Sequence, residues 1–118
     1  MQPWLMGKLC PPSGIYSTTA DLSKMILAQL LAYEENQNSP LLLTKDVVPI
    51  GENTTMKYGY GFYVYGNSGS LGHGGEMDGY AGDYSINPKL KRGHAILTSC
   101  AGDEVYGLSA KIAAIFYQ

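Results

Sequence analysis

The feature that most constrains the fold is a change of hydrophobic period near residue 58. Between residues 18 and 33 apolar residues recur every three or four positions, which predicts a helix with an apolar stripe at Leu22, Met25, Ile26, Leu30 and Tyr33. From Tyr58 to about residue 100 the period is two, and Gly, Asn, Ser and Pro interrupt it at short intervals. The second half of the chain is therefore expected to form successive antiparallel strands.

The turn residues divide this run into four expected strands, over residues 58–65, 70–75, 80–86 and 93–100. The last of them is nearly all apolar in its middle, as in a strand covered on both faces. Asp103 is expected to cap a final helix with its own apolar stripe. The predicted fold is α+β, an antiparallel sheet of about four strands flanked by an N-terminal and a C-terminal helix, in a single domain over residues 1–118.

The N-terminal helix has a recognisable start. Thr18, followed three residues later by Asp21, has the spacing of a capping box, in which the two residues exchange hydrogen bonds across the first turn of the helix. Leu27 and Leu31 widen the apolar stripe. We therefore expect this helix to be buried on more than one side.

Composition excludes several classes of function. The net charge is -2 and no basic block occurs, so the electrostatic footprint of a nucleic-acid-binding protein is missing. No apolar run is long enough to span a membrane, and the first residues do not resemble a signal peptide. Only 15% of the residues are charged, which indicates that some apolar surface is meant for a partner.

The cysteines and histidines do not predict a metal or cofactor site. Cys10 and Cys100 are far apart in the sequence, and either buried free thiols or a bridge between them fits this spacing. His94 opens an apolar strand and is expected to be a structural or edge residue. With His73 it makes only a pair, and no third ligand follows at a zinc-like spacing. No metal and no cofactor is predicted.

Residues 70–82 hold His73 among five glycines. Neighbours without side chains leave the imidazole exposed and let another molecule approach the backbone closely. The same pattern is typical of a tight turn with an incidental histidine, so a site on a strand edge and a plain turn are both open readings. Glu76 and Asp78 are most simply explained as polar residues of a solvent-exposed bend.

Four motifs in order nevertheless resemble one family. They are residues 12–18 (PSGIYST) followed by Asp21 and Leu22, residues 58–62 (YGYGF), residues 72–75 (GHGG), and residues 79–98 from Gly-Tyr through Ile-Asn-Pro to the apolar strand. Together they resemble the C-terminal portion of the serine β-lactamase and penicillin-binding-protein family, in the class C-like branch with esterases and D-amino-acid-specific peptidases. The resemblance implies that residues 1–118 form part of a larger domain whose parent is exported, periplasmic or on the cell surface.

The resemblance also implies roles for individual residues. His73, Gly74 and Gly75 are similar to the His-x-Gly version of the family's third active-site motif. His73 would lie beside the substrate carboxylate and the proton-relay groups, Gly75 would let the acyl group sit against the strand, and the Glu76 N–H would be an oxyanion-hole donor. Gly74, Tyr60 and Tyr80 would line the substrate site. The substrate of the parent would be a β-lactam, a D-amino-acid peptide or an ester.

The family's nucleophile is missing from this sequence. None of the serines has a lysine three residues later, and without that lysine the hydroxyl is a poor nucleophile. The Tyr65-Gly66-Asn67 triplet is expected to be turn residues rather than the family's second motif. The sequence thus predicts one wall of a hydrolase site that is inactive alone.

Two further classes of function remain open. In the family's sheet, the strand that corresponds to Gly93–Cys100 lies beside strands that this chain does not contain. An unpaired apolar edge favours self-association through Gly93–Cys100. Alternatively, the groove at His73 could serve a non-catalytic peptide- or cell-wall-binding module.

Overall fold

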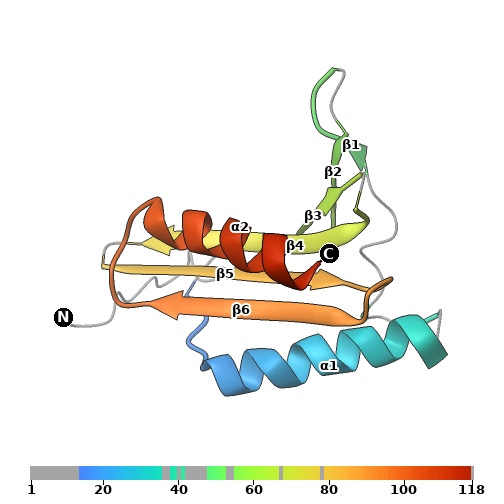
Figure 1. The fold of residues 1–118 in the computed structure, drawn as a ribbon, viewed down its shortest axis with the longest axis horizontal. Helices are drawn as coiled ribbons and strands as arrows, with labels where there is room; N and C mark the ends of the chain where they lie inside the picture. Colours follow the sequence, from blue (N-terminus) through green and yellow to red (C-terminus); the bar gives the residue numbers. More distant parts are fainter. Residues whose placement is uncertain are drawn as a thin grey trace.

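The computed structural model describes residues 14–35, 38–39, 41, 48–52, 55–66, 68–77 and 79–117. Its elements are, in order, α1 (Thr19–Glu35), β1 (Val48–Pro49), β2 (Met56–Gly59), β3 (Phe62–Tyr65), β4 (Ser70–Met77), β5 (Tyr80–Asn87), β6 (Arg92–Thr98) and α2 (Glu104–Phe116). The strands form one antiparallel sheet in which β1 to β6 lie side by side in chain order. The two helices lie on different sides of this sheet (Figure 1). The α+β class is therefore confirmed.

The sheet has six strands rather than about four. The expected strand over residues 58–65 is in fact part of a hairpin formed by β2 and β3. Gly59 lies opposite Phe62 next to the turn, and Met56 lies opposite Tyr65 at the far end. Its turn consists of Tyr60 and Gly61, with positive φ angles of 29° and 87°. Gly61 adopts this left-handed conformation without strain, which permits a reversal in only two residues. β1, which pairs with β2, is the other strand that the sequence analysis does not predict.

The core lies between α1 and the sheet. Ile26 of α1 packs with Leu71, Tyr84 and Ile86 of β4 and β5. Gly93 of β6 allows this contact, because a Cβ there would lie 2.7 Å from Ile26 Cγ2 and 2.9 Å from Ile86 Cγ2. Thr18 is confirmed as the N-cap, since the Asp21 N–H donates to Thr18 Oγ1 at 3.1 Å. The Asp21 carboxylate accepts from the Thr18 hydroxyl at 3.1 Å, which is not the backbone bond that the second half of a capping box makes. The close approach of Ile26 to Gly93 is what brings α1 against the sheet.

Each helix buries only one face. In α1 the buried residues include Ile26, whereas Leu27 and Leu31 are exposed, so the expectation that this helix is buried on more than one side is wrong. The reason is that α1 contacts the sheet along one stripe only. In α2 Val105 and Ser109 face the sheet, and Ile115 is 71% exposed. A considerable apolar surface therefore remains uncovered by the described residues.

The start of α2 also differs from its prediction. Asp103 occupies the N-cap position, but its side chain makes no capping hydrogen bond. Its φ of -62° and ψ of -13° are helical, and this rotates the carboxylate away from the first-turn N–H groups that a cap in the extended region would reach.

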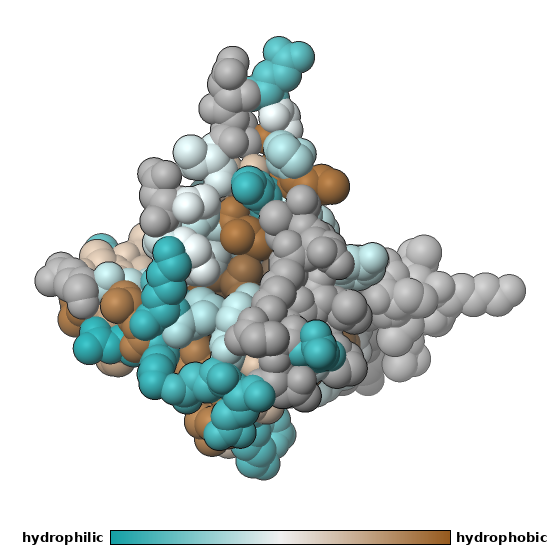
Figure 2. All heavy atoms as spheres, turned by 90° about the vertical axis from the view of Figure 1, so that its right-hand side faces the viewer, coloured by the Kyte–Doolittle hydropathy of each residue, from teal (hydrophilic) through white to brown (hydrophobic). Residues whose placement is uncertain are grey.

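The turn between β5 and β6 joins the sheet to the ends of both helices. Lys91 pairs with Glu34 near the end of α1, and Arg92 donates to the carbonyl of Phe116 at the end of α2. Figure 2 shows hydrophilic side chains gathered over the lower part of this end of the molecule. At the other end of β6, Cys100 is exposed, contrary to the buried-thiol reading, and Cys10 lies outside the described residues.

Candidate functional site

The first candidate site is the part of β4 that extends beyond β3. β4 pairs with β3 only from Ser70 to Gly72, but it pairs with β5 from Leu71 to Met77. Among the described residues, the β3-facing edge of β4 is therefore unpaired from Gly74 to Met77. Alternate residues of such an edge present an N–H and a C=O to whatever lies beside it.

His73 lies where β3 leaves β4, and its side chain is exposed. Its ring stacks on Tyr63 with 5.3 Å between centroids and meets Tyr58 edge-on at 6.1 Å. Tyr58 and Tyr63 in turn contact each other at 4.9 Å. The two tyrosines thus fix the imidazole beside the open edge.

The contact of His73 with its own neighbour determines the tautomer of the neutral ring. Nδ1 lies 2.6 Å from the carbonyl oxygen of Gly74. A carbonyl oxygen can only accept, so Nδ1 carries the proton and donates it. Nε2 of the neutral ring is then a hydrogen-bond acceptor, able to bind a hydroxyl or to take a proton.

The two glycines after His73 have different surroundings. A Cβ on Gly75 would meet nothing within 4 Å, so this position is open to another molecule. A Cβ on Gly74 would lie 2.5 Å from the ring of Tyr106, so α2 covers that position. Glu76 pairs with Ala81 across the ladder and its side chain is exposed.

The tyrosines expected at the site are not those whose rings contact His73 among the described residues. Tyr60 is a turn residue between β2 and β3, and Tyr80 starts β5 opposite Met77. The ring contacts of His73 come from Tyr58 and Tyr63 instead. Both belong to the tyrosine-rich run 58–65, but the hairpin within that run decides which of its rings turn towards β4.

A second polar cluster lies under α2. His94 Nε2 lies 2.8 Å from Ser109 Oγ and 3.6 Å from Asp83 Oδ2, and the Ser109 hydroxyl donates to Asp83. On the other side of the ring, Nδ1 lies 3.1 Å from the Tyr117 hydroxyl, which donates to the Ser85 carbonyl at 3.2 Å. The cluster therefore links α2 to β5 and β6.

This cluster contains a serine, a histidine and an aspartate, but it lacks the arrangement of a catalytic triad. In a triad the carboxylate holds Nδ1 while Nε2 accepts the serine proton. Here the serine and the carboxylate are both at Nε2, and the serine donates to the carboxylate. Ser109 is also buried, so the cluster serves to position α2 rather than to attack a substrate. The reading of His94 as a structural residue is consistent with these contacts.

The cluster makes the stability of the fold depend on pH. Burial by itself would raise the pKa of Asp83, but hydrogen bonds from His94 and Ser109 lower it below its ordinary value. A carboxyl whose pKa is lower in the folded chain stabilises the fold above its unfolded pKa, and this stabilisation is lost as the pH falls through the folded value.

Asp83→Asn is therefore expected to lower the free energy of unfolding by about 1.5–3 kcal/mol at neutral pH, because it removes the charge that accepts the Ser109 hydrogen bond and pairs with His94. The difference from the unmodified chain should shrink as the pH falls below about 4. Urea unfolding at several pH values measures it. Asp103→Asn, which changes an exposed carboxylate without a side-chain capping bond, is the control. A difference that stays constant down to low pH would contradict the role of Asp83.

No group of three or more His, Cys, Asp and Glu side chains in the described ranges could hold a metal ion. Within the same ranges, no helix is long and apolar enough to cross a membrane. Comparison with known proteins finds no matching family model and no similar curated protein.

Proposed function

We propose that this chain is the C-terminal segment of a β-lactamase-like serine hydrolase and supplies one wall of its acyl-transfer site. The nucleophile would come from polypeptide outside this sequence, because no Ser-x-x-Lys occurs within it. The reaction would transfer an acyl group from a β-lactam, peptide or ester to water.

The observation that carries this proposal is the unpaired edge of β4 beside an exposed histidine. An extended substrate can pair with such an edge, and Gly75 leaves room for an acyl group against the backbone. A backbone N–H on this edge would be held rigidly by the β5 ladder, as an oxyanion donor must be. The ordered motifs at residues 12–22, 58–62, 72–75 and 79–98 support the same assignment.

The proposal fits the hydrogen bond that the His73 ring makes with Gly74. With the proton of the neutral ring on Nδ1, Nε2 is free to accept a hydrogen bond from a substrate or from a relay hydroxyl. Protonation of the same ring would instead favour a substrate carboxylate. Either form lies next to the edge at which a bound substrate would be held.

The decisive experiment uses the reading frame upstream of Met1. We expect an in-frame Ser-x-x-Lys there, and the longer protein should form a covalent adduct with a fluorescent penicillin or hydrolyse a p-nitrophenyl ester. In that protein His73→Ala should lower kcat/KM by about 10²–10⁴, the range for loss of a proton-transfer group. Gly75→Val should lower it by at least about 10² through exclusion of the acyl group, an effect comparable to the loss of an oxyanion donor.

The control is Gly107→Ala on α2, where a Cβ also meets nothing within 4 Å. It should fold as well as Gly75→Val and keep full activity. The isolated 118-residue chain should give neither turnover nor labelling. A stoichiometric adduct on the isolated chain, or full activity of the His73→Ala protein, would contradict the proposal.

A second candidate function is self-association through the edge of β6. Within the described ranges β6 pairs only with β5, and no charged side chain occurs between Gly93 and Cys100. Leu97 on this strand is 44% exposed, and Leu27 and Leu31 are exposed on the helix that packs against it. An apolar, uncharged edge lacks the features that prevent strands of two molecules from pairing.

Self-association predicts a dimer or larger species in sedimentation velocity at micromolar concentration. Leu97→Lys should weaken it by at least about tenfold, because a charge on an edge strand opposes pairing. Val48→Lys introduces the same charge at the opposite edge of the sheet, on an exposed residue, and should leave the association unchanged. A monomeric unmodified chain would exclude this function.

A further inference from the structure

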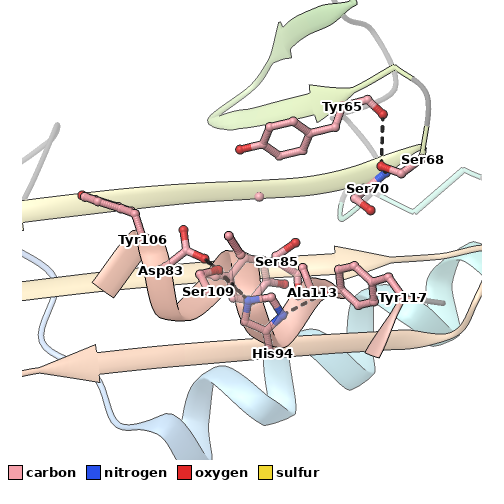
Figure 3. Close-up of a pocket in the computed structure, with 13 residues that line it drawn as sticks. Tyr65, Ser68, Ser70, Asp83, Ser85, His94, Tyr106, Ser109, Ala113 and Tyr117 are labelled. Carbon is pink, nitrogen blue, oxygen red and sulfur yellow. Dashed lines mark hydrogen bonds and ion pairs between the residues drawn. The ribbon is translucent and has the colours of Figure 1, made fainter. Parts of the chain in front are cut away.

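The polar cluster under α2 forms a chain of hydrogen bonds in which the position of each proton can be worked out. The Ser109 hydroxyl has one proton and donates it to Asp83, because an ionised carboxylate can only accept. His94 Nε2 lies 2.8 Å from the same hydroxyl oxygen. Nε2 must therefore carry a proton and donate it to Ser109. Figure 3 shows the His94 ring on β6 between Ser109 and Tyr117.

The other ring nitrogen also faces a hydroxyl whose proton is in use. The Tyr117 hydroxyl oxygen lies 3.1 Å from His94 Nδ1 and 3.2 Å from the carbonyl oxygen of Ser85. The carbonyl can only accept, so the phenol donates to Ser85, and Nδ1 must donate to the phenol oxygen. A ring that donates from both nitrogens is an imidazolium.

A neutral ring cannot satisfy all of these contacts. With its proton on Nε2, Nδ1 becomes an acceptor, and it competes with the Ser85 carbonyl for the single proton of Tyr117. One of the two contacts of Tyr117 is then lost. In a part-buried site the acceptor that is left without a donor destabilises the arrangement.

The surroundings of the ring favour its charged form. The His94 side chain is 9% exposed, and Asp83 Oδ2 lies 3.6 Å from Nε2 as a counter-ion. Burial would raise the pKa of Asp83, but hydrogen bonds from His94 and Ser109 lower it below its ordinary value. This carboxyl therefore stays ionised over the pH range in which an imidazole ordinarily titrates.

Other charged groups near the ring have partners elsewhere. Arg92, two residues before His94 on β6, donates to the carbonyl of Phe116. On the other side of the sheet, Glu34 of α1 pairs with Lys91. The remaining titratable side chains packed around this part of the sheet are phenols, Tyr65 of β3, Tyr84 of β5, Tyr106 of α2 and Tyr33 of α1. Asp83 is therefore the charged group that acts on the ring most directly.

We propose that His94 and Tyr117 form a proton-dependent clasp that holds the C-terminal end of α2 on the sheet. In the closed clasp the imidazolium donates to Ser109 and Tyr117, and Tyr117 donates to Ser85. Loss of the Nδ1 proton leaves Tyr117 with one of its two partners. The clasp therefore weakens as the pH rises through the titration of the imidazole, and it also weakens when acid protonates Asp83.

The clasp matters because packing holds this end of α2 only loosely. The fully buried residues of α2 are Val105 and Ser109, and both lie in the first half of the helix. A cavity of about 460 Å³ lies between α2 and the strands beside the cluster. The attachment of the last turn thus depends on polar contacts.

The test uses the His73→Gln chain, in which His94 is the one remaining imidazole. Ring ¹⁵N NMR should find protons on both nitrogens at about pH 5.5 and on Nε2 alone at about pH 8.5, on either side of the ordinary imidazole titration. Between these pH values, the hydrogen-exchange protection factor of the Tyr117 N–H, which donates to Ala113, should fall about threefold to tenfold, as for one net hydrogen bond. A neutral ring at about pH 5.5, or an unchanged protection factor, would overturn the proposal.

Two tyrosine variants of the same chain separate the clasp from general effects of pH. Tyr117→Phe removes only the phenol oxygen, so protection of the last turn should be low and nearly equal at both pH values. Tyr106→Phe removes the same group from the same helix, at a residue outside this chain of hydrogen bonds, and should keep the full response. A Tyr117→Phe chain that responds to pH as its parent does would refute the clasp.

Discussion

Ile86→Ala is expected to lower the free energy of unfolding by about 2–5 kcal/mol, the range for a buried isoleucine replaced by alanine. Ile86 is 0% exposed and lies in the core between α1 and the sheet, next to Ile26 and under Gly93. The loss combines the transfer of the side chain from water with the cavity that remains. For a domain of this size, such a loss is a large part of the total stability.

The matched control is Ile115→Ala, the same change at a residue of α2 that is 71% exposed. It should alter stability by less than about 0.5 kcal/mol, as surface substitutions do. Urea unfolding followed by circular dichroism compares the two. Equal losses at both positions would mean that the packing of α1 on the sheet is not the core of this fold.

Gln29→Leu is expected to lower the free energy of unfolding by about 1–3 kcal/mol, because it leaves a buried hydroxyl without an acceptor. Tyr84 donates its hydroxyl to Gln29 Oε1 in the interface between α1 and β5, and Gln29 is 2% exposed. Burial also raises the pKa of Tyr84 well above its ordinary value, so the phenol remains a donor throughout the accessible pH range.

The double variant Gln29→Leu with Tyr84→Phe tests the physical reason for this loss. Replacing both partners of a buried hydrogen bond with apolar groups can be nearly neutral, so the double variant should recover most of the stability that Gln29→Leu loses. A double-mutant cycle from urea unfolding gives the coupling energy directly. If the two losses simply add, the two side chains do not interact as described.

The sequence predicts those parts of the fold that depend on local patterns. The start of α1 follows from Thr18 as its N-cap with Asp21 three residues later, and β4, β5 and β6 follow from alternation between turn residues. The β2–β3 hairpin is missed because a two-residue turn does not interrupt the period-two pattern. The short β1 has too few residues to show any period.

The candidate sites likewise depend on contacts that local sequence patterns do not predict. His73 stands out from the sequence because glycines surround it, but its contacts with Tyr58 and Tyr63 depend on where the hairpin turns. The cluster of His94 with Asp83 and Ser109 depends on the register of β5 with β6, which pairs Ser85 with His94, and on which side of α2 meets the sheet. Neither is encoded by a spacing that can be read along the chain.

The meander order of the sheet has a consequence for how the chain folds. Because each strand pairs with its neighbour in sequence, the sheet can assemble by successive short-range hairpins, with little entropy lost in closing long loops. The contacts of α1 with β6 instead join residues as distant as Ile26 and Gly93. Arrival of α1 on the finished sheet is therefore expected to limit the folding rate, with the hairpins formed earlier.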